Sequence, residues 1–375
     1  MNKKKIMLLI ALTLAFAIIG TVCFFLGRSI AMSDFNSERE LNIKINLSEL
    51  ENLESIEGPI YVTGHKSPDS DTVGSSIAYA ALLQKLGYDA RPVVLGNINK
   101  ETGYILDSAG VAVPGLLEDA SGCNMILIDH SSYSQSADGL KNAYIVSIID
   151  HHGDGTITTG NPLVYDARPL GSTATIIWIR YRNYGLKPDQ QIAMVMLGSI
   201  LSDTNNLLSS STTTADREAL KALSKIAGVS DTDAFYREIF KASLSYDGMT
   251  DEEIFYSDYK EYECNGINYA IGCINVYDEA GAKEIATRMK AVLPSAIKDK
   301  GMDFALAQIS VFHDDLSITY LVPSDEETAK IIEAAYSDLA RFDGTSYVIS
   351  PGISRKKDLV PALTNILGTY EFSSH

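Results

Sequence analysis

The chain has 375 residues, of which 46% are hydrophobic, and its formal net charge is −17 at pH 7. This length is sufficient for two domains, each with its own core. The strong negative charge argues against a general nucleic-acid binder, because such proteins need a positive surface for phosphate contacts. A phosphate-handling enzyme of this composition has to gather its cations locally, as metal ions or as a small Lys/Arg cluster.

The first predicted element is a hydrophobic helix over residues 6–26, which form 21 consecutive positions without a charge or a proline. A helix of that length spans about 30 Å, the thickness of the hydrocarbon core of a membrane. Lys3, Lys4 and Lys5 precede it and only Arg28 follows closely, so the positive-inside rule keeps the N-terminus in the cytoplasm. We expect a single-pass plasma-membrane anchor, with the catalytic part outside the cytoplasm.

A cleaved signal peptide is the alternative to this anchor. Ser29-Ile30-Ala31 offers small residues at a cleavage site, and cleavage near Ala31 would make the protein secreted. The apolar run is long for a signal peptide, which favours an anchor over residues 1–31. Residues 32–58 are polar and acidic with a weak helical pattern, and we interpret them as a spacer.

Short apolar runs separated by helical stretches follow, and this alternation is typical of a parallel sheet with crossover helices. The runs cover residues 60–62, 92–95, 125–128 and 144–149, and a helix is expected over residues 73–86. Three of the runs lead into His65, Asp129 and Asp150. Ligands of parallel α/β sheets bind beyond the carboxyl ends of the strands, so these side chains should converge although they are far apart in sequence.

A second α/β unit is predicted after residue 246, which gives a first domain of residues 59–246 and a second, smaller one of residues 247–375. A hairpin turn at Asn265-Gly266 would place Cys264 opposite Ile267. Helices are predicted over residues 254–263, 280–293 and 326–341, and strands over residues 268–276, 304–310 and 316–321.

Several metal-ligand types occur in these segments. Three candidates lie in His65-Lys66-Ser67-Pro68-Asp69-Ser70-Asp71, on a loop that opens a helix, although Asp69 or Asp71 could serve simply as the helix N-cap. Further candidates lie in Asp129-His130 and Asp150-His151-His152, and at Asp203, which closes a helical stretch. Four of the six histidines of the chain fall in these segments, which favours one shared metal site over coincidence.

The donor types indicate which metals such a site would take. Imidazole nitrogens with several carboxylate oxygens suit Mn²⁺, Fe²⁺, Co²⁺ or Mg²⁺ better than metals that prefer thiolates. Four Asp and two His suffice for two ions with a bridging carboxylate. Two ions about 3.5–4 Å apart generate a nucleophile from water and neutralise a phosphoryl group during in-line displacement.

The ordered motifs resemble those of family II, manganese-dependent inorganic pyrophosphatases of the DHH phosphoesterase superfamily. Residues 65–71 resemble their H-x-N-P-D-x-D motif, Ile128-Asp129-His130 is similar to their second motif, and Asp150-His151-His152 is the DHH tripeptide. Gly171-Ser172-Thr173-Ala174-Thr175 and Ser202-Asp203 match later blocks in order and spacing.

The resemblance extends to the second predicted domain and covers residues 59 to 370. Ser354-Arg355-Lys356-Lys357 resembles the S-R-K-K-Q signature of the C-terminal DHH-associated domain. A solvated basic stretch is the alternative interpretation of these residues. In a chain this acidic, a basic cluster is more readily explained as an anion-binding site.

The resemblance implies hydrolysis of inorganic pyrophosphate to two phosphates by a metal-bridged hydroxide at a dinuclear Mn²⁺ or Co²⁺ site, in the cleft between the two domains. Mg²⁺ could accompany the substrate. One metal would be held by His65, Asp69 and Asp129. The other would be held by Asp71, Asp129, His151 and Asp203, with Asp129 as the bridge.

The same resemblance assigns roles around the metals. Asp150 would orient a histidine ligand, and His152 would face the substrate as a phosphate donor or proton source. The electrophilic phosphate would be bound by Lys241, Arg355 and Lys356.

The sequence also departs from the family pattern. Ser67 replaces the usual Asn, Asp358 stands where Gln is expected, and residues 204–209 lack the usual Phe-Lys-Ser-Pro pattern. All of the implied metal ligands are present, so we expect activity, with the substrate preference open between pyrophosphate and short polyphosphate.

Two rival functions remain at this point. The first is an exopolyphosphatase or another DHH phosphodiesterase, although the chain shows no aromatic platform for stacking nucleic-acid bases. The second is a non-catalytic exported protein that binds phosphate or metal, against which the intact ligand set argues. A homodimer is compatible with either reading.

Overall fold

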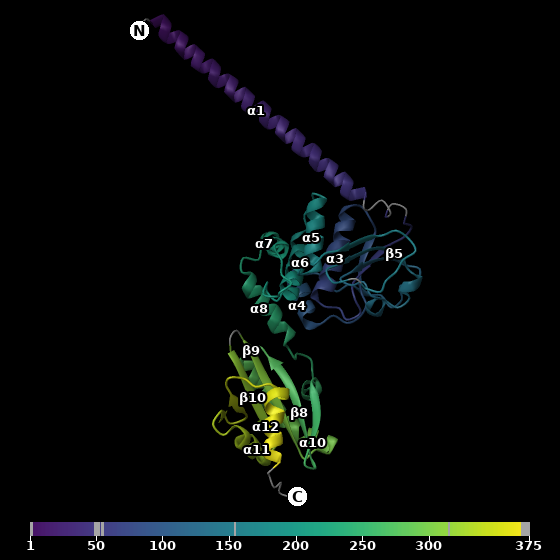
Figure 1. Ribbon diagram of the computed structural model, residues 1–375, viewed down its shortest axis with the longest axis vertical. Helices are drawn as coiled ribbons and strands as arrows, with labels where there is room; N and C mark the ends of the chain where they lie inside the picture. The colour runs from purple at the N-terminus through teal and green to yellow at the C-terminus, as the bar shows by residue number, and fades with distance from the viewer. Residues whose placement is uncertain (1–2, 49–52, 54–55, 154, 314–315, 369–375) are drawn as a thin grey trace. The chain divides into compact units, whose positions relative to one another are not determined.

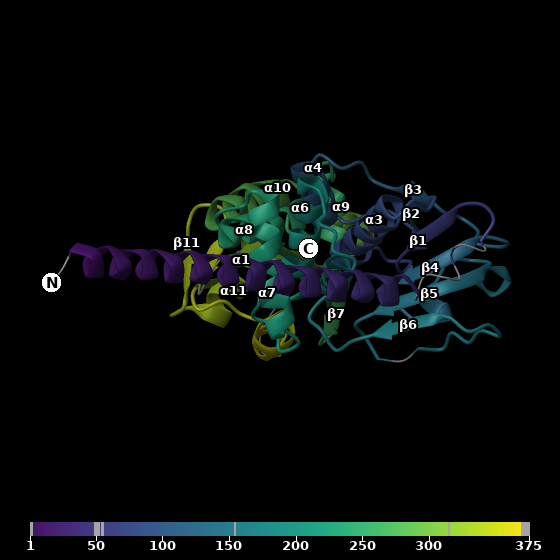
Figure 2. The ribbon, with the colours of Figure 1, turned by 90° about the horizontal axis from the view of Figure 1, so that it is seen from above.

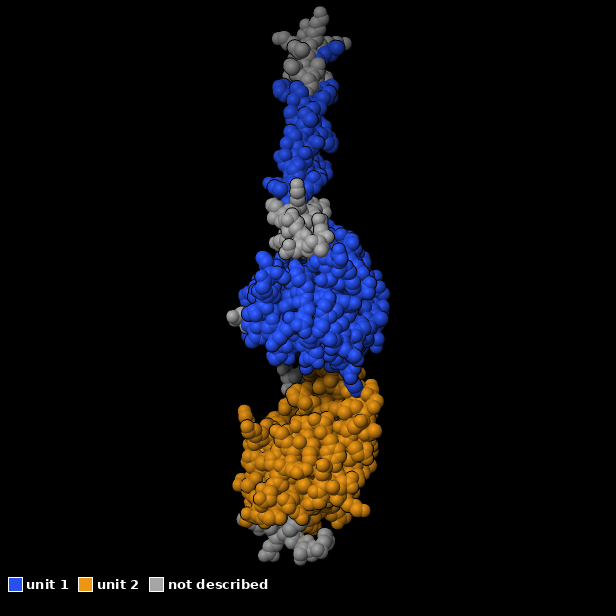
Figure 3. Space-filling view, turned by 90° about the vertical axis from the view of Figure 1, so that its right-hand side faces the viewer, with its two compact units in different colours: residues 1–236 blue, residues 237–375 orange. Residues whose placement is uncertain are grey.

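A computed structural model describes residues 3–48, 53, 56–153, 155–313 and 316–368. The chain divides into two compact units, residues 1–236 and 237–375 (Figure 3). The two-domain α/β organisation predicted from the sequence is confirmed. The division precedes the predicted boundary after residue 246, and it falls within helix α8 (Thr232–Ser243).

The N-terminal helix α1 runs unbroken from Lys3 to Ser48 (Figure 1). It continues through the residues predicted to form the end of the anchor and much of the spacer. Its side chains from residue 16 to residue 38 are all exposed. Among the described residues, one segment is long and apolar enough to cross a membrane, Phe16–Glu38 of this helix.

The first unit is built on six parallel strands in the order β3-β2-β1-β4-β5-β6. Figure 2 shows these strands side by side. Their bounds are Ile60–Thr63 for β1, Ala90–Val94 for β2, Gly115–Leu116 for β3, Asn124–Ile128 for β4, Tyr144–Asp150 for β5 and Val164–Ala167 for β6. The parallel sheet predicted from the apolar runs is confirmed, and β3 and β6 extend it at its two edges.

Helices of the first unit pack on this sheet and on one another. They are α3 (Ser70–Lys85), α4 (Lys100–Ala109), α5 (Thr173–Asn183), α6 (Gln190–Asp203), α7 (Thr214–Ala227) and the start of α8. One core joins Ile77 of α3 to Val94 of β2 and Val195 of α6. A separate core joins Leu127 of β4 to Leu140 in the β4–β5 connection, which consists of two 3₁₀ turns where the sequence pattern predicts a crossover helix.

The chain adds β2 and β3 on one side of β1 and then β4, β5 and β6 on its other side, so the order of strand addition reverses between β1 and β4. In open parallel sheets this switch point leaves a crevice at the carboxyl ends of the strands, where ligands bind. His65 follows β1, and Asp129 follows β4, its hydrogen-bonded neighbour. The fold therefore carries two of the candidate ligands to the one place on the sheet where connections leave in opposite directions.

The second unit has a mixed sheet of six strands in the order β11-β12-β10-β9-β8-β7. The strands β8 and β9 are parallel and connected by a long helix, and the other neighbours are antiparallel. Bounds are Asp251–Tyr256 for α9, Tyr259–Cys264 for β7, Ile267–Val276 for β8, Glu279–Lys300 for α10, Phe304–His313 for β9, Leu316–Pro323 for β10, Glu326–Tyr336 for α11, Ala340–Phe342 for β11, Tyr347–Ile349 for β12, Arg355–Leu359 for the π-helical turn η3 and Val360–Leu367 for α12.

Both faces of this sheet are covered by helices. Met289 of α10 packs with Ile309 of β9 in one core, which α9 also joins. Ile331 of α11 and Leu363 of α12 pack with Leu306 in the other core. Alternate faces of β9 thus serve separate cores, which explains why that strand is apolar almost throughout.

Two predicted helices of this unit are wrong in part. Residues 259–263, predicted as helical, form the edge strand β7, whose pairing with β8 follows from the tight turn at Asn265-Gly266. That turn and the pairing of Cys264 with Ile267 are as predicted. The helix predicted to reach residue 341 ends at Tyr336, because the chain turns there into β11, which pairs with β12.

Candidate metal centre

The loop between β1 and α3 carries the first two candidate ligands. Gly64 lets this loop pass close to α3, because a Cβ there would lie 2.1 Å from Cγ2 of Thr72. Nε2 of His65 lies 3.3 Å from Oδ2 of Asp69 and 3.6 Å from Oδ2 of Asp129. Asp69 is also the N-cap of α3, since its Oδ1 accepts the Thr72 backbone N–H at 2.9 Å. One oxygen of Asp69 caps the helix and the other faces His65, so the capping and ligand interpretations hold together.

Asp71, in the first turn of α3, is buried against the N-terminus of α5. Its Oδ1 accepts hydrogen bonds from the Ser172 hydroxyl at 2.7 Å and the Ala174 N–H at 3.0 Å. Its Oδ2 accepts the Thr173 N–H at 2.6 Å. The first N–H groups of a helix have no partners within the helix and carry partial positive charge, which suits a carboxylate.

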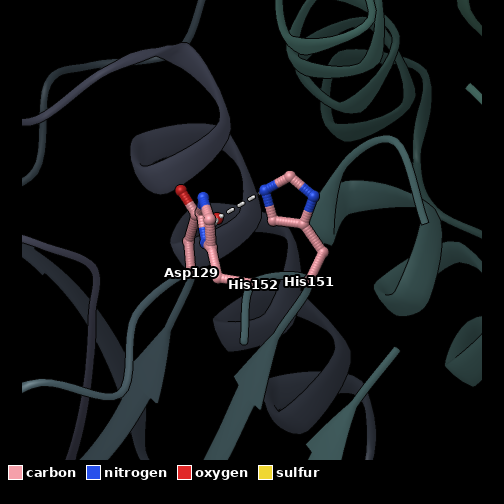
Figure 4. Close-up of side chains that lie close together, drawn as sticks. All are labelled: Asp129, His151 and His152. Carbon is pink, nitrogen blue, oxygen red and sulfur yellow. Dashed lines mark ion pairs between the residues drawn. The ribbon is translucent and has the colours of Figure 1, made fainter. Parts of the chain in front are cut away.

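Asp129 lies between the two sets of donors. Its backbone is left-handed, with φ 63°, and its N–H donates to the Ile149 carbonyl of β5 at 2.8 Å. Its Oδ2 faces His65, while its Oδ1 lies 3.3 Å from Nε2 of His151. Figure 4 shows the His151 ring directed at Asp129. Each oxygen thus faces a different histidine, which is the arrangement that a bridging carboxylate needs.

The tautomer of His151 is fixed by its surroundings. Its Nδ1 lies 3.0 Å from the Leu170 carbonyl, which can only accept a hydrogen bond, so Nδ1 carries a proton. Nε2 is then the atom that can bind a metal, and it lies 3.3 Å from Oδ2 of Asp203. That Asp203 oxygen is buried and has no hydrogen-bond partner within the described part of the chain.

Asp150 differs from its predicted role. Its Oδ1 accepts the backbone N–H of His152 at 3.0 Å and lies 2.9 Å from Nδ1 of the same ring. The histidine that Asp150 orients is therefore the substrate-facing candidate His152, whereas the ligand candidate His151 is oriented by the Leu170 carbonyl. The His152 side chain is 58% exposed, which leaves its ring accessible to a bound molecule.

The buried carboxylates give this cluster an excess of negative charge. Burial, reinforced by Asp129, raises the pKa of Asp71 to about 6. Burial, reinforced by Asp71 and Asp129, raises the pKa of Asp203 to about 10. Burial alone would lower the pKa of His151, but the hydrogen bond to Asp129 and the neighbouring carboxylates raise it to about 10. The cluster thus favours added positive charge.

The donor set fits divalent metal ions. Three overlapping groups of side chains bring their ligand atoms within 4.8 Å of one another, and Asp129 belongs to two of the three: Asp129, His151 and His152; His65, Asp69 and Asp129; Asp71, His151 and Asp203. Carboxylate and imidazole donors match the preferences of Mn²⁺ and Co²⁺. The unpartnered buried oxygen of Asp203 is the atom that a cation would satisfy.

The chain is strained where it leaves α6. Asn205, Asn206 and Leu207 all have left-handed backbones, with φ of 48°, 54° and 65°. Oδ1 of Asn205 accepts the Tyr236 hydroxyl, and Nδ2 of Asn206 donates to Oδ1 of Asp233 at 3.0 Å. This turn takes the place of the family's Phe-Lys-Ser-Pro pattern and ties the segment after Asp203 to helix α8.

The predicted substrate-binding cations all belong to the second unit. Lys241 is exposed near the end of α8, and Lys356 is exposed in η3. The guanidinium of Arg355 donates at 2.8 Å both to the Asp258 carbonyl and to its Oδ1. Asp358, which departs from the family pattern, accepts the Ser354 N–H at 2.8 Å and so stabilises the start of this turn.

The structure therefore brings the six predicted metal ligands into one cluster at the switch point of the first sheet. His130 does not join them, since its Nδ1 donates to the Ile128 carbonyl at 2.9 Å and its Nε2 lies 2.9 Å from the Ser136 hydroxyl. Sequence reasoning gave no role to Thr72 or Thr173, whose hydroxyls bond to Asp129. The Gly171–Thr175 block was the available signal for the latter.

Comparisons with known proteins identify relatives of both units of the chain. Residues 59–200 match the N-terminal domain of the DHH family, and residues 237–366 match the DHHA2 domain. The chain is 36% identical to a probable manganese-dependent inorganic pyrophosphatase of Lactobacillus gasseri, over 81% of this chain and 97% of the relative. It is 36% identical to the manganese-dependent inorganic pyrophosphatase of Methanocaldococcus jannaschii, again over 81% and 97%.

Among solved structures, the chain is similar to a candidate family II inorganic pyrophosphatase of Methanococcus jannaschii. The two are 33% identical with a TM-score of 0.49, and the match covers 82% of this chain and 99% of the other. The matches to the curated relatives span nearly their whole length, and the family domains begin only at residue 59. The chain belongs to the family of manganese-dependent inorganic pyrophosphatases, with a DHH domain followed by a DHHA2 domain.

Proposed function

We propose that this protein hydrolyses inorganic pyrophosphate to two phosphates with two Mn²⁺ ions, or Co²⁺ ions, bound at the cluster around Asp129. The single observation that supports this most strongly is the Asp129 carboxylate, one oxygen of which faces His65 and the other His151. His65 and Asp69 would hold one ion with Asp129. The second ion would be held by Asp71, His151 and Asp203, together with Asp129.

Bound metal ions would polarise the phosphate oxygens and generate a nucleophile from water. Two residues beside the metal positions, Asp150 and His152, would assist the reaction. Asp150 holds the His152 ring through Nδ1, so Nε2 is the ring nitrogen left to contact a substrate. The hydrogen bond to Asp150 raises the pKa of His152, so the ring can donate a proton or hydrogen bond to a phosphate oxygen near neutral pH.

The second unit would supply the cations for the electrophilic phosphate, which has to be neutralised on the side away from the metals. Lys356 is the strongest candidate, because it is exposed and its neighbour Arg355 is already engaged with Asp258. Lys241 and Arg355 would assist when the second unit meets the first. Pyrophosphate, rather than nucleic acid, suits an acidic chain with so few clustered cations.

We further propose that α1 anchors the protein in the plasma membrane by a single pass, with residues 59–375 outside the cytoplasm. The exposed apolar segment Phe16–Glu38 and the three lysines ahead of the apolar run support this topology. Secretion after cleavage near Ala31 is the competing outcome.

Cleavage of three substrates by the full-length protein in detergent tests the reaction, with phosphate release measured for the two phosphoanhydrides and linear product measured by chromatography for the cyclic dinucleotide. Pyrophosphate, tripolyphosphate and a cyclic dinucleotide are each supplied with Mn²⁺, Co²⁺ or Mg²⁺. We expect pyrophosphate with Mn²⁺ or Co²⁺ to give the highest kcat/KM. A higher value for tripolyphosphate would point to an exopolyphosphatase, preferential cleavage of the cyclic dinucleotide would point to a phosphodiesterase, and cleavage of none of them would point to a binding protein.

The variant Lys356→Ala tests the part played by the second unit. Loss of one charge-stabilising donor should lower kcat/KM for pyrophosphate about 10²–10³-fold without loss of Mn²⁺ affinity. Lys357→Ala, which removes the same charge from the same turn, is the matched control and should change kcat/KM little. Equal losses of kcat/KM in the two variants would contradict a specific role for Lys356, because any positive charge in this turn would then serve equally well.

A further inference from the structure

We infer that Thr72 and Thr173 are positioning residues that fix the orientation of the Asp129 carboxylate, so that each of its oxygens faces one metal position. The inference rests on the proposed function, because it concerns the setting of the proposed two-metal site. It also gives a role to the Gly171–Thr175 block, which has none in the proposed reaction.

The two hydroxyls hold the carboxylate from opposite sides. Oγ1 of Thr72 donates to Oδ2 of Asp129 at 2.8 Å, and Oγ1 of Thr173 donates to Oδ1 at 3.0 Å. All three residues are at most 2% exposed. The donors come from the first turns of two different helices, α3 and α5.

One hydroxyl on each oxygen is the arrangement that fixes a bridging carboxylate without disabling it. A carboxylate oxygen has two lone-pair positions, so a single hydrogen bond leaves the other free for a metal. With both oxygens held, the carboxylate cannot rotate to place both toward one metal position. Partners of this kind orient ligands and thereby raise metal affinity.

Thr173 also connects the two metal positions. Its backbone N–H donates to Oδ2 of Asp71 at 2.6 Å, while its hydroxyl donates to Asp129. Thr173 therefore holds two carboxylates. One is Asp129, which the two metal positions share, and the other is Asp71, which belongs only to the second metal position. Substituting valine removes only the hydroxyl bond, because the backbone N–H remains and the side chains have similar shape.

The same helix provides a matched control. Oγ1 of Thr175, also fully buried, donates to Oδ1 of Asp216 at 2.6 Å. Oδ2 of Asp216 accepts the Gly171 N–H at 2.9 Å and the Thr213 N–H at 2.7 Å. Among the described residues, Asp216 belongs to none of the groups that could hold a metal. Thr175→Val thus removes a hydroxyl–carboxylate bond of the same kind, two residues along α5, from a carboxylate with a purely structural setting.

The experiment measures Mn²⁺ binding to the full-length protein in detergent by isothermal titration calorimetry, with the metal-free Tm recorded for every variant. Thr173→Val and Thr72→Val should each weaken Mn²⁺ binding about 10–100-fold. Thr173→Ser, which keeps the hydroxyl, should restore most of the affinity. Thr175→Val should lower Tm and leave Mn²⁺ affinity at the wild-type value.

The outcomes separate the inference from the function on which it rests. Wild-type protein that binds no Mn²⁺ would overturn the proposed function and the inference with it. Wild-type protein that binds two ions, with Thr173→Val unchanged in affinity, would overturn the inference alone. Equal weakening by Thr173→Val and Thr175→Val would do the same, because the hydroxyls would then act only through general stability.

Discussion

His130 and His151 follow neighbouring strands at the same end of the sheet, yet their rings have different surroundings. Both ring nitrogens of His130 are engaged inside the protein, and burial lowers its pKa. His151 engages only Nδ1 and presents Nε2 to two carboxylates. The ligand is thus distinguished by the partner of its second nitrogen, which adjacency in the sequence does not reveal.

This contrast gives a paired prediction. His151→Asn removes a direct ligand and should weaken Mn²⁺ binding by at least about 100-fold, more than the loss of an outer partner does. His130→Asn should leave Mn²⁺ affinity unchanged and lower the free energy of unfolding by about 1–2 kcal/mol, because buried hydrogen bonds are lost. Calorimetric titration and chemical denaturation measure the two effects, and a large affinity loss in His130→Asn would contradict the assignment.

Among the elements, β6 and α5 are joined by a buried ion pair whose strength depends on pH. The Asp166 carboxylate accepts hydrogen bonds from two arginines. Nε of Arg168 lies 2.6 Å from Oδ1, and Nη2 of the almost fully buried Arg180 lies 2.7 Å from Oδ2. Burial raises the pKa of Asp166, but the Arg168 hydrogen bonds and the charge of Arg180 outweigh it and bring that pKa below its usual value. The charged form of Asp166 therefore stabilises the fold.

The stability that the charged form of Asp166 contributes is lost at low pH. A carboxyl whose folded-state pKa is lowered contributes its full stability above the unfolded-state pKa of about 3.9 and loses it as pH falls through the folded-state value. Asp166→Asn leaves Arg180 buried without its partner and should cost about 3–5 kcal/mol in the free energy of unfolding near neutral pH. The difference from wild type should shrink below about pH 4.

Chemical denaturation of the two proteins across pH measures this difference. The control is Asp89→Asn, which removes a carboxylate from a similar but exposed pair with Arg91. It should leave the free energy of unfolding unchanged, since exposed pairs contribute little. A wild-type to Asp166→Asn difference that grows toward low pH would contradict the stated direction.

The elements that the sequence predicts well are those with a single strong pattern. The apolar runs that became β1, β4 and β5 are buried within a parallel sheet, so polar residues are rare in them, with Ser147 of β5 as an exception. The two-residue β3 and the half-exposed β6 have no such run. In Tyr259–Cys264, Glu and Lys favour a helix locally, but pairing with β8 overrides that preference, and the charges lie on an edge strand where they are tolerated.

The candidate site was predictable to the extent that its residues follow strands. His65, Asp129 and Asp150 could be placed together from topology alone, and the family motifs supplied the other ligands. The hydroxyl partners of Asp129 could not be found this way, because Thr72 and Thr173 come from different helices whose approach depends on tertiary packing. Asp150 orients His152, and the Leu170 carbonyl orients His151. This assignment depends on the directions of the side chains, which motif spacing does not specify.

At the scale of the whole molecule, the proposed topology makes a prediction about accessibility. A single cysteine at position 57 (Glu57→Cys), in a background with the four native cysteines changed to serine, lies at an exposed position between α1 and β1, well beyond the apolar segment. A membrane-impermeant maleimide applied to intact cells should label it. Asn2→Cys, on the other side of the apolar run, should be labelled only after lysis, and the reverse pattern would place residues 59–375 in the cytoplasm.

The left-handed backbone of Asp129 implies a trade-off between activity and stability. A non-glycine residue in this conformation costs about 1–2 kcal/mol, and Asp129 adds a buried charge beside Asp71 and Asp203. Asn tolerates the same backbone, and its single amide oxygen can still accept one of the two hydroxyl bonds. Asp129→Asn should therefore abolish hydrolysis, by about 10³-fold or more, and yet raise the Tm of the metal-free protein.

Scanning calorimetry with and without Mn²⁺ compares the two proteins. Wild type should gain Tm on adding the metal, because ligands that bind only the folded state stabilise it, and Asp129→Asn should gain little. A metal-free Asp129→Asn protein that melts below wild type would show that the residue stabilises the fold. On the expected result, natural selection has kept at this position a residue that the empty protein would be more stable without.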